Sequence, residues 1–472
     1  MEAKIFFGSN EATNNNIQQI KNPFTNEVVS TYPLCSKKEA IKALNIANKA
    51  KKETKNSTLS QRIDWLNDVA NKMEKSIDDF AKTIVDEVGK PMFFAKIEVQ
   101  RCIELLRLSA STMINISGET FPTDATPSGK KSLSYFYREP VGVVVAITPF
   151  NFPLNLVAHK IAPALVSGNS VVLKPTSEAP LTAYKFVKLF IQSRYAITDA
   201  ISLVYGDKEV GEALTKSSIP RVISFTGSVP VGNAITQNAG IKKIALELGG
   251  NAATYVDEKA DIKDASEKCA KAAFYNSGQV CISLQRIYVH KSIYDEFAKN
   301  MASVTKSLKV GDPYDDDTFV GPLINEEATQ KAKSWCESAI KEGAKAICGA
   351  LNDGKVFYPT IMTEVKDDMN IVCKEVFAPI VSLIKVDNFD EALDKINSSP
   401  YGLQYSIFTN DLSLAKRAID EFECGGVVVN DVPSLRFDIQ PYGGAKLSGI
   451  GKEGPRYAIE DDFTQIKSVV IF

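Results

Sequence analysis

The sequence has few of the residues from which metal centres and histidine-dependent catalytic triads are built. Only two histidines occur, His159 and His290, and neither has a motif around it. Metal sites commonly combine several imidazole or thiolate ligands, and a catalytic triad needs a histidine as its general base. We therefore expect no metal centre, and a hydrolase that uses His159 or His290 is a weak alternative.

An excess of charge of one sign is also absent. The chain has 55 Lys and Arg residues and 57 Asp and Glu residues, which gives a formal net charge of −2. Proteins that neutralise nucleic-acid phosphates or coat anionic membranes carry a marked positive charge. The balance therefore predicts no nucleic-acid partner and no membrane partner, and leaves a small molecule as the expected ligand.

Long hydrophobic runs and paired cysteines are missing as well. The most apolar stretch, Val141–Leu154, contains two prolines and is too short to span a bilayer. The first residues lack the basic and apolar regions of a secretory signal. The eight cysteines are scattered, with no Cys-x-x-Cys pair, which is typical of a reducing compartment. Together these features predict a cytoplasmic protein.

The sequence does have strand and helix patterning over most of its length. Its 472 residues are enough for about three domains. The first third has apolar residues at helical spacing in 37–52, 61–88 and 95–113. Short apolar strands then alternate with helices, in one series up to Leu248 and in a second from Ala252. This alternation predicts an α/β fold with a doubly wound parallel sheet and a second α/β domain.

The first candidate site directly follows a buried strand, in the sequence Thr148-Pro149-Phe150-Asn151-Phe152-Pro153. The prolines force a turn at the carboxyl end of a parallel strand, where open α/β sheets build their sites. Asn151 has two interpretations. Its amide suits the stabilisation of an oxyanion, but on spacing alone a turn Asn that caps the next helix is the simpler choice.

Two further strand ends carry residues suited to a nucleotide. Lys174 can reach a ribose hydroxyl or a phosphate, although alone it is better explained as a solvated loop charge. Gly227, Ser228 and Gly232 lie where glycines allow close backbone approach and a helix N-terminus favours a phosphate. Their spacing matches neither the G-x-G-x-x-G fingerprint nor a P-loop, so by itself it indicates an ordinary strand–helix turn.

Three later segments carry candidate reactive or ligand-binding groups. Glu247 lies between two leucines, where it is either a functional carboxylate with a raised pKa or a solvent-facing residue of an alternating strand. Cys281 follows a glycine-bearing turn whose N–H groups can favour a thiolate, although most cysteines are small core residues. Glu375 and Phe377 share one side of an extended segment, where they can accept ribose hydroxyls and wall a nicotinamide.

In this order and spacing, the motifs resemble those of the NAD(P)-dependent aldehyde dehydrogenase superfamily over nearly the whole chain. The resemblance implies that Cys281 attacks an aldehyde to give a thiohemiacetal, whose oxyanion Asn151 and the Cys281 N–H stabilise. Hydride transfer to the nicotinamide would leave a thioester, and Glu247 would activate the water that hydrolyses it. Cofactor contacts are implied for Thr148, Pro149, Phe150, Lys174, Ser177, Gly227, Ser228, Gly232, Glu375 and Phe377.

The family fold implies three parts: a cofactor-binding domain of residues 1–117 and 139–249, a catalytic domain of residues 250–440, and a β arm of residues 118–138 and 459–472. The apolar terminal strand Ile466–Phe472 needs a partner, either in the same chain or in another subunit. The resemblance implies a partner in a neighbouring subunit, because the arm would join subunits of a homodimer or homotetramer. The cofactor is NAD or NADP. Ser177 stands where strictly NAD-dependent members commonly carry Glu, and Ser does not repel a 2′-phosphate, so this choice stays open.

Segments 434–438 and 454–460 resemble the branch of lactaldehyde and non-phosphorylating glyceraldehyde-3-phosphate dehydrogenases. This predicts oxidation of a small aldehyde of the lactaldehyde or glycolaldehyde type; glyceraldehyde-3-phosphate, succinate semialdehyde and acyl transfer to coenzyme A are the alternatives. Arg436 is the candidate contact for a polar or anionic substrate, because arginine binds carboxylate and phosphate groups well. For Arg101 and Arg107 a surface salt bridge is the simpler interpretation.

Overall fold

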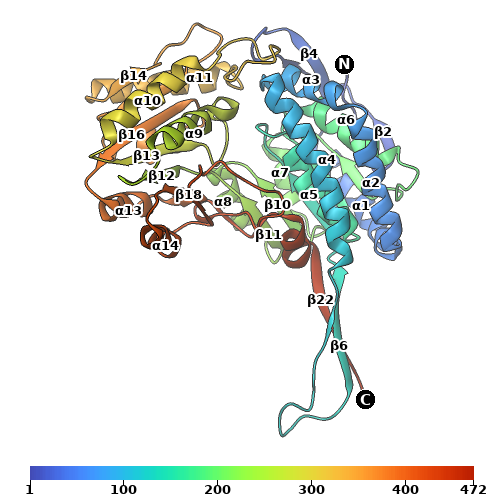
Figure 1. The fold of residues 1–472 in the computed structure, drawn as a ribbon. Helices are drawn as coiled ribbons and strands as arrows, with labels where there is room; N and C mark the ends of the chain where they lie inside the picture. The colour runs from blue at the N-terminus through green and yellow to red at the C-terminus, as the bar shows by residue number, and fades with distance from the viewer.

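The computed structural model describes all 472 residues as two lobes with a β arm that projects away from them (Figure 1). The sheet of the first lobe has the strand order β2-β1-β9-β8-β7-β10-β11-β21. Its parallel centre consists of β9 (Ile201–Leu203), β8 (Ser170–Lys174), β7 (Val143–Ile147), β10 (Val222–Thr226) and β11 (Lys243–Glu247). From β7 the chain continues to β8 and β9 on one side, and then returns to form β10 and β11 on the other side. The strand order therefore reverses between β7 and β10, and sheets of this kind bind ligands at that switch point.

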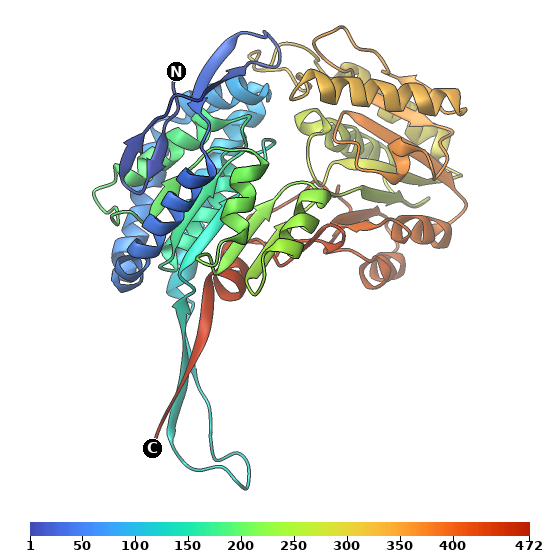
Figure 2. The ribbon, with the colours of Figure 1, turned by 180° about the vertical axis from the view of Figure 1, so that it is seen from behind.

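Helices cover both faces of this sheet, which confirms the predicted doubly wound arrangement (Figures 1 and 2). One face carries α5 (Asn155–Val166) and α6 (Pro180–Ile191), and α2 (Leu59–Glu74), α3 (Ile77–Val88) and α4 (Met92–Ile114) pack outside them. The other face carries α1 (Lys37–Asn56), α7 (Lys208–Lys216) and α8 (Val229–Asn238).

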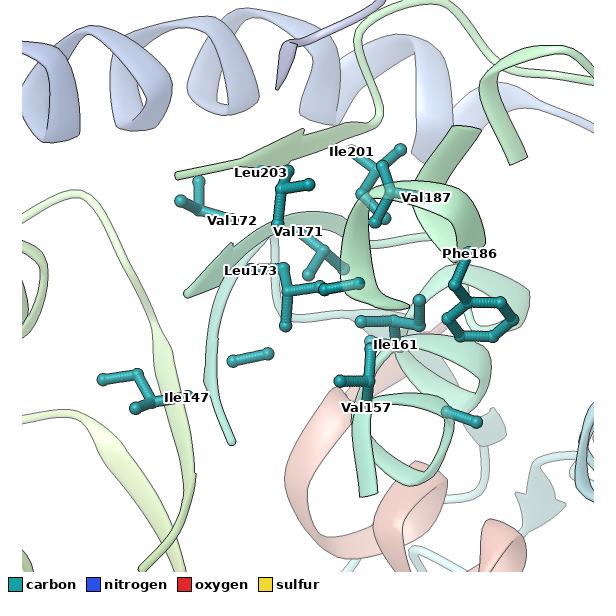
Figure 3. Packing of buried hydrophobic residues seen from close by; sticks show 14 of the residues in the cluster. Ile147, Val157, Ile161, Val171, Val172, Leu173, Phe186, Val187, Ile201 and Leu203 are labelled. Atoms are coloured by element: carbon teal, nitrogen blue, oxygen red, sulfur yellow. The ribbon is translucent and has the colours of Figure 1, made fainter. Parts of the chain in front are cut away.

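The core of the first lobe forms where α5 and α6 pack on β7 and β8. Figure 3 shows Val157 and Ile161 of α5 beside Leu173 of β8, with Phe186 and Val187 of α6 on the same side. All of these side chains are fully buried. Their packing holds the carboxyl ends of β7 and β8, and therefore the first two candidate motifs, in fixed positions.

The second lobe is built on a seven-stranded sheet, in the order β14-β15-β16-β13-β12-β18-β19. The chain enters it after β11, through Leu248–Asn251. Six strands are parallel: β12 (Ala252–Val256), β13 (Leu284–His290), β15 (Thr360–Thr363), β16 (Ile380–Val386), β18 (Gln404–Phe408) and β19 (Gly426–Val429). The antiparallel edge is β14 (Lys345–Cys348), and the helices are α9 (Ile262–Phe274), α10 (Tyr294–Ser307), α11 (Glu326–Lys341), α12 (Asn370–Cys373), α13 (Phe389–Asn397) and α14 (Leu412–Glu421).

The β arm contains β5 (Glu119–Thr120), β6 (Leu133–Pro140) and the terminal β22 (Thr464–Ile471). Strand β22 pairs with β6 along its whole length, from Thr464 opposite Pro140 to Ile471 opposite Leu133. The expectation that the terminal strand finds its partner in a neighbouring subunit is therefore wrong for this edge. The partner lies in the same chain, and the outer edge of β22 has no strand beside it.

Two expectations for the N-terminal third also need correction. Four short strands precede the helices: β1 (Ile5–Phe7), β2 (Asn10–Ala12), β3 (Ile17–Lys21) and β4 (Val28–Pro33). The single helical pattern 61–88 is two helices, α2 and α3, separated at Lys75 and Ser76. The Ser76 hydroxyl donates to Lys72 O, a local side-chain bond that competes with helix continuation.

The remaining short elements are η1 (Tyr275–Gly278), β17 (Tyr401–Gly402), β20 (Ala445–Lys446), β21 (Gly449–Ile450), α15 (Pro455–Tyr457) and η2 (Ala458–Phe463). They fold the C-terminal segment back onto the first lobe, where β21 pairs with β11 and Phe463 joins the core. No helix of the structure has the length and apolar character needed to cross a membrane.

Candidate active site

Two adjoining cavities lie at the switch point of the first sheet. The first, of about 680 Å³, is lined from the ends of β7, β8 and β10, with Thr148, Pro149, Lys174, Ser177 and Gly227 among its residues. The second, of about 360 Å³, is lined from both lobes, by residues that include Phe150, Asn151, Ser228, Glu247, Cys281, Glu375, Phe377, Arg436 and Tyr442. Pro149, Thr226 and Gly227 line both cavities. Most of the predicted site residues are thus brought together.

The first cavity has the features of a dinucleotide site. The hydroxyls of Thr148 and Thr226 are buried without a hydrogen-bond partner, so donors and acceptors are available for a ligand. Burial lowers the pKa of Lys174 to about 8. A Cβ on Gly227 would lie 2.6 Å from the Phe225 ring, so this position requires glycine. The residues present therefore fit a nicotinamide dinucleotide.

Gly232 has a different place from the one the resemblance implies. It lies in the first turn of α8 and lines neither cavity. A Cβ there would meet Leu248 Cδ2 at 2.7 Å. Gly232 therefore allows α8 to pack closely on the segment that links the two lobes.

The turn before Cys281 has an unusual backbone. Asn276, Ser277 and Gly278 have φ angles of 49°, 56° and 71°, a run of left-handed residues that costs free energy at Ser277. Side chains hold it: the Ser277 hydroxyl donates to Gly321 O at 3.0 Å, and Asn276 Nδ2 donates to Asn151 O at 3.3 Å. The turn thereby fixes the position of Cys281 relative to the first lobe.

Asn151 is tied to this same turn. Its Nδ2 donates to Gln279 O at 2.9 Å, whereas helix α5 begins after Leu154 with no side-chain cap. The capping interpretation of Asn151 therefore fails, and its amide lies beside the segment that carries Cys281. The backbone N–H of Cys281 makes no hydrogen bond within the protein, so it is free to bind an oxyanion.

The Cys281 thiol is partly buried and has one hydrogen-bond partner. Its Sγ lies 3.0 Å from the hydroxyl of Tyr442. Burial raises the pKa of Cys281 to about 11, against the lowering effects of Tyr442 and Arg436. The other seven cysteines line neither cavity, so the choice of Cys281 among the eight agrees with the geometry.

Glu247 ends β11 with its carboxylate in the second cavity. Its side chain is buried, and Oε2 has no hydrogen-bond partner. The solvent-facing interpretation therefore fails. Burial, followed by the charge of Glu453, raises the pKa of Glu247 well above its ordinary value, so the carboxyl is poised to take up a proton.

A buried charge cluster lies beneath these groups. Glu453 accepts hydrogen bonds from Lys160 at 3.1 Å and from Arg436 at 2.9 Å. Burial opposes the ionised form, but Lys160 and Arg436 lower the pKa of Glu453 to about 2. The Arg436 guanidinium stacks over the Tyr442 ring at 3.8 Å from its centroid, and its Nε is buried without a partner. Arg436 therefore lines the cavity as a cation that is paired with Glu453 and whose Nε has no partner.

The other predicted arginines and the two histidines lie outside the cavity. Arg101 forms an ion pair with Asp438 at 2.5 Å, and Arg107 pairs on the surface with Glu74 at 2.7 Å. His159 contacts Asp438 and Arg436, whereas His290 contacts Ser292. Neither histidine contacts Cys281, so the hydrolase alternative has no general base at the thiol.

The mouth of the second cavity combines a carboxylate with two aromatic rings. Glu375 Oε1 accepts the N–H of Gly250 at 2.9 Å, and burial raises the pKa of Glu375 to about 7. The rings of Phe150 and Phe377 meet edge to face, with centroids 5.9 Å apart. These groups line the second cavity beside Pro149 and Gly227, which line both cavities, and they suit a ribose and a flat nicotinamide ring.

Comparison with known proteins agrees with this geometry. The profile of the aldehyde dehydrogenase family matches residues 10–469. The 3-sulfolactaldehyde dehydrogenase of Priestia aryabhattai is 40% identical over 454 residues, 96% of this chain and 94% of that protein. The lactaldehyde dehydrogenase of Methanocaldococcus jannaschii is 40% identical over 455 residues, 95% of this chain and 96% of that protein.

A solved structure extends the similarity to three dimensions. The glyceraldehyde-3-phosphate dehydrogenase GapN of Methanocaldococcus jannaschii, complexed with NADP, superposes with a TM-score of 0.92 at 39% identity and covers 96% of this chain and 98% of its own. The resemblance inferred from the motifs is therefore confirmed, including its lactaldehyde dehydrogenase and GapN branch. The chain belongs to the aldehyde dehydrogenase family and is an NAD(P)-dependent oxidoreductase.

Proposed function

We propose that this enzyme oxidises a small hydroxyaldehyde, of the lactaldehyde or glycolaldehyde type, to its carboxylic acid with NAD or NADP. The observation that carries the proposal is the convergence of Cys281, Glu247 and Asn151 on one cavity of about 360 Å³. That volume suits a small substrate beside a nicotinamide ring. Catalytic roles are assigned to these three residues on the same ground.

The thiolate of Cys281 attacks the aldehyde carbon, and the new C–S bond gives a thiohemiacetal. The Asn151 amide and the free N–H of Cys281 stabilise the oxyanion; the loss of one such donor typically lowers kcat by about 10²–10³. The bound cofactor supplies a hydride acceptor. A thioester of Cys281 remains, in which the sulfur is a good leaving group.

Glu247 acts in the second half of the reaction. Its buried, unpartnered Oε2 accepts a proton from water, and the resulting hydroxide attacks the thioester carbon. The C–S bond then breaks, which regenerates the Cys281 thiolate and releases the carboxylic acid. Transfer of the acyl group to coenzyme A would need no such base, so the position of Glu247 favours hydrolysis.

A second candidate is an aldehyde that carries an anionic group. The observation that favours it is the unpartnered Nε of Arg436, which lines the same cavity as Cys281. The similar 3-sulfolactaldehyde and glyceraldehyde-3-phosphate dehydrogenases are named for anionic hydroxyaldehydes. Succinate semialdehyde belongs to the same class of substrate, because it has a carboxylate at the end remote from the aldehyde.

Initial rates of reduced cofactor formation discriminate the two candidates. Lactaldehyde, glycolaldehyde, glyceraldehyde-3-phosphate and succinate semialdehyde are compared in the wild type and in Arg436→Met, with the surface variant Arg107→Met as the control. An anionic substrate predicts a KM increase of at least tenfold in Arg436→Met only for the anionic aldehydes. A preference for neutral hydroxyaldehydes with an unchanged KM supports the first candidate, and no oxidation of any of them refutes both.

The cofactor cleft is proposed to accept NADP as well as NAD. Ser177 lines it together with Lys208, whose ammonium favours a 2′-phosphate, and the similar GapN structure is complexed with NADP. Ser177→Glu should lower kcat/KM for NADP by at least tenfold and leave the value for NAD within about threefold. Equal losses for both cofactors would contradict this role of Ser177.

We also propose that residues 1–117 and 139–249 bind the cofactor, that residues 250–440 form the catalytic domain, and that the arm joins subunits into a homodimer or homotetramer. The arm exposes Ile466, Val470 and Ile471 along β22, a strand whose outer edge is free. Light scattering should give two or four times 51.6 kDa, and Ile466→Lys with Ile471→Lys should lower this mass. Ile340→Lys, an exposed residue of α11, is the control.

A further inference from the structure

The side chain that contacts the Cys281 sulfur is a tyrosine. The hydrogen bond of 3.0 Å between Tyr442 Oη and Cys281 Sγ is the only side-chain hydrogen bond that either residue makes. Tyr442 is 3% exposed, so water does not compete freely for its hydroxyl. A buried phenol whose only protein partner is the sulfur is available to act on it.

Tyr442 is held in place from three sides. Its backbone forms a bridge with Glu453, with N–H to O distances of 3.1 and 2.6 Å in the two directions. The Arg436 guanidinium lies over its ring, and Glu453 binds that guanidinium in turn. The ring packs in a small apolar cluster with Phe152, Leu156, Val280, Ile282 and Leu403. The hydroxyl is therefore preorganised toward the sulfur.

The direction of this hydrogen bond depends on the charge of the sulfur. A neutral thiol can donate to the phenol oxygen or accept from it, whereas a thiolate can only accept. A hydrogen bond to an ionised acceptor is roughly twice as strong as a neutral one. The Tyr442 hydroxyl therefore stabilises the ionised form of Cys281 over the neutral form.

The other charged groups around the sulfur do not replace this contact. Arg436 favours the thiolate from its place over the ring, whereas Glu247 and Glu375 oppose it, as does burial. No lysine, arginine or histidine side chain hydrogen-bonds Sγ. The phenol is the one side-chain donor positioned to offset the desolvation of the nucleophile.

We propose that Tyr442 is a further catalytic residue, whose hydroxyl donates a hydrogen bond to the Cys281 thiolate and so increases the fraction of nucleophile that is ready to attack; this rests on the proposed role of Cys281. The thiol proton leaves to water. As the C–S bond forms, the electron pair of the sulfur moves to carbon and that of the carbonyl bond moves to oxygen. The proton of Tyr442 stays on the phenol oxygen throughout.

The test is the pH dependence of Cys281 alkylation by iodoacetamide, without cofactor or aldehyde, followed by mass spectrometry of the peptide that contains Cys281. Tyr442→Phe keeps the ring under Arg436 and removes only the hydroxyl. Tyr275→Phe removes the hydroxyl of a neighbouring tyrosine, whose ring packs against the ring of Phe152 and which does not line the cavity that contains Cys281. The three proteins are compared at pH 6–10, below the pKa of Cys281 of about 11, where the alkylation rate is proportional to the fraction of thiolate.

We expect Cys281 of Tyr442→Phe to be alkylated about 10- to 100-fold more slowly than in the wild type at each pH in this range, which corresponds to a pKa rise of one to two units, as the loss of a hydrogen bond to a charged group implies. Tyr275→Phe should be alkylated at the wild-type rate. An unfolding midpoint equal to that of the wild type shows that the fold of Tyr442→Phe is intact. An unchanged alkylation rate, or the same loss in both variants, would overturn the proposal. Because alkylation needs no aldehyde, a slower rate in Tyr442→Phe of an enzyme that oxidises none of the aldehydes would refute the proposed function alone.

Discussion

Replacement of one partner of the buried Lys90–Glu98 ion pair should destabilise the enzyme more than replacement of both. Each side chain is at most 1% exposed. Glu98 Oε2 accepts from Lys90, and Oε1 accepts the backbone N–H groups of Leu154 at 2.9 Å and Asn155 at 3.1 Å. These two residues start α5 directly after the turn that carries Asn151, so the ion pair supports both the lobe and the site.

The expected magnitude follows from which contacts each variant loses. Lys90→Met leaves Glu98 as an uncompensated buried charge, which typically costs about 3–5 kcal/mol. Glu98→Gln keeps Oε1 for the two N–H groups but leaves the Lys90 ammonium unpaired, so its cost falls in the same range. The double variant buries no charge, and Met replaces an ammonium 3.8 Å from the Phe152 ring centroid. We expect it to lie within about 2 kcal/mol of the wild type.

Differential scanning calorimetry at one scan rate measures this difference. About 1 kcal/mol corresponds to roughly 2–4 °C for a domain of 150–250 residues, so each single variant should unfold at least about 6 °C below the wild type and the double variant closer to it. Lys271→Met is the control, because Lys271 and Glu267 form an exposed pair on α9 that contributes little. A double variant with a midpoint as low as the sum of both single effects would refute the reasoning.

Four shorter predictions concern the site and its surroundings. Glu247→Gln should still give a burst of reduced cofactor equal to the enzyme concentration, followed by a steady state slower by about 10²–10⁴; stopped-flow absorbance measures both. The steady-state rate of the wild type should fall as the pH is lowered, because Glu247, with its raised pKa, becomes protonated and loses its function as a base. Gly250→Ala should abolish most activity, since a Cβ there would lie 2.2 Å from Cys281 O, and the burst amplitude measures this loss. Gly211→Ala, inside α7 with nothing within 4 Å of the added Cβ, should raise the unfolding midpoint by an amount that corresponds to at most about 1 kcal/mol.

Local sequence patterns predicted two kinds of element: helices with one buried and one exposed face, and short apolar strands between turns. The bounds of helix α5 could not be predicted because all twelve of its residues are buried, so it lacks the polar face that produces a helical period. Strands β2 and β3 were missed because they are largely exposed and polar, so they lack the apolar run that marks strands of similar length in the parallel sheet. The in-chain partner of β22 was missed because strand pairing joins segments more than three hundred residues apart, which no local pattern records.

The same distinction holds within the site. Asn151, Lys174 and Gly227 could be found because they lie at or just after the ends of β7, β8 and β10, and the carboxyl ends of parallel strands meet at one edge of a sheet. Tyr442 contacts a residue 161 positions away, and no local pattern records such a contact, so nothing in the sequence marked its hydroxyl. The partners of Arg436 could not be found either, because its ion pair with Glu453 depends on the C-terminal segment folding back onto α5.

The site contains two buried glutamates, and their different hydrogen-bond partners explain why only one of them is suited to act as a base. Glu247 and Glu453 are both buried and influence each other, but Glu453 has Lys160 and Arg436 as hydrogen-bonded partners while Oε2 of Glu247 has none. The cations hold Glu453 ionised, and its fixed negative charge adds to burial in raising the pKa of Glu247. Where the environment pushes two carboxyl pKa values apart, the carboxyl with the raised pKa is assigned the proton-transfer role. Removal of Lys160 or Arg436 would therefore affect Glu247 as well as the charge cluster. Without these cations Glu453 would tend to lose its negative charge, which contributes to the raised pKa of Glu247.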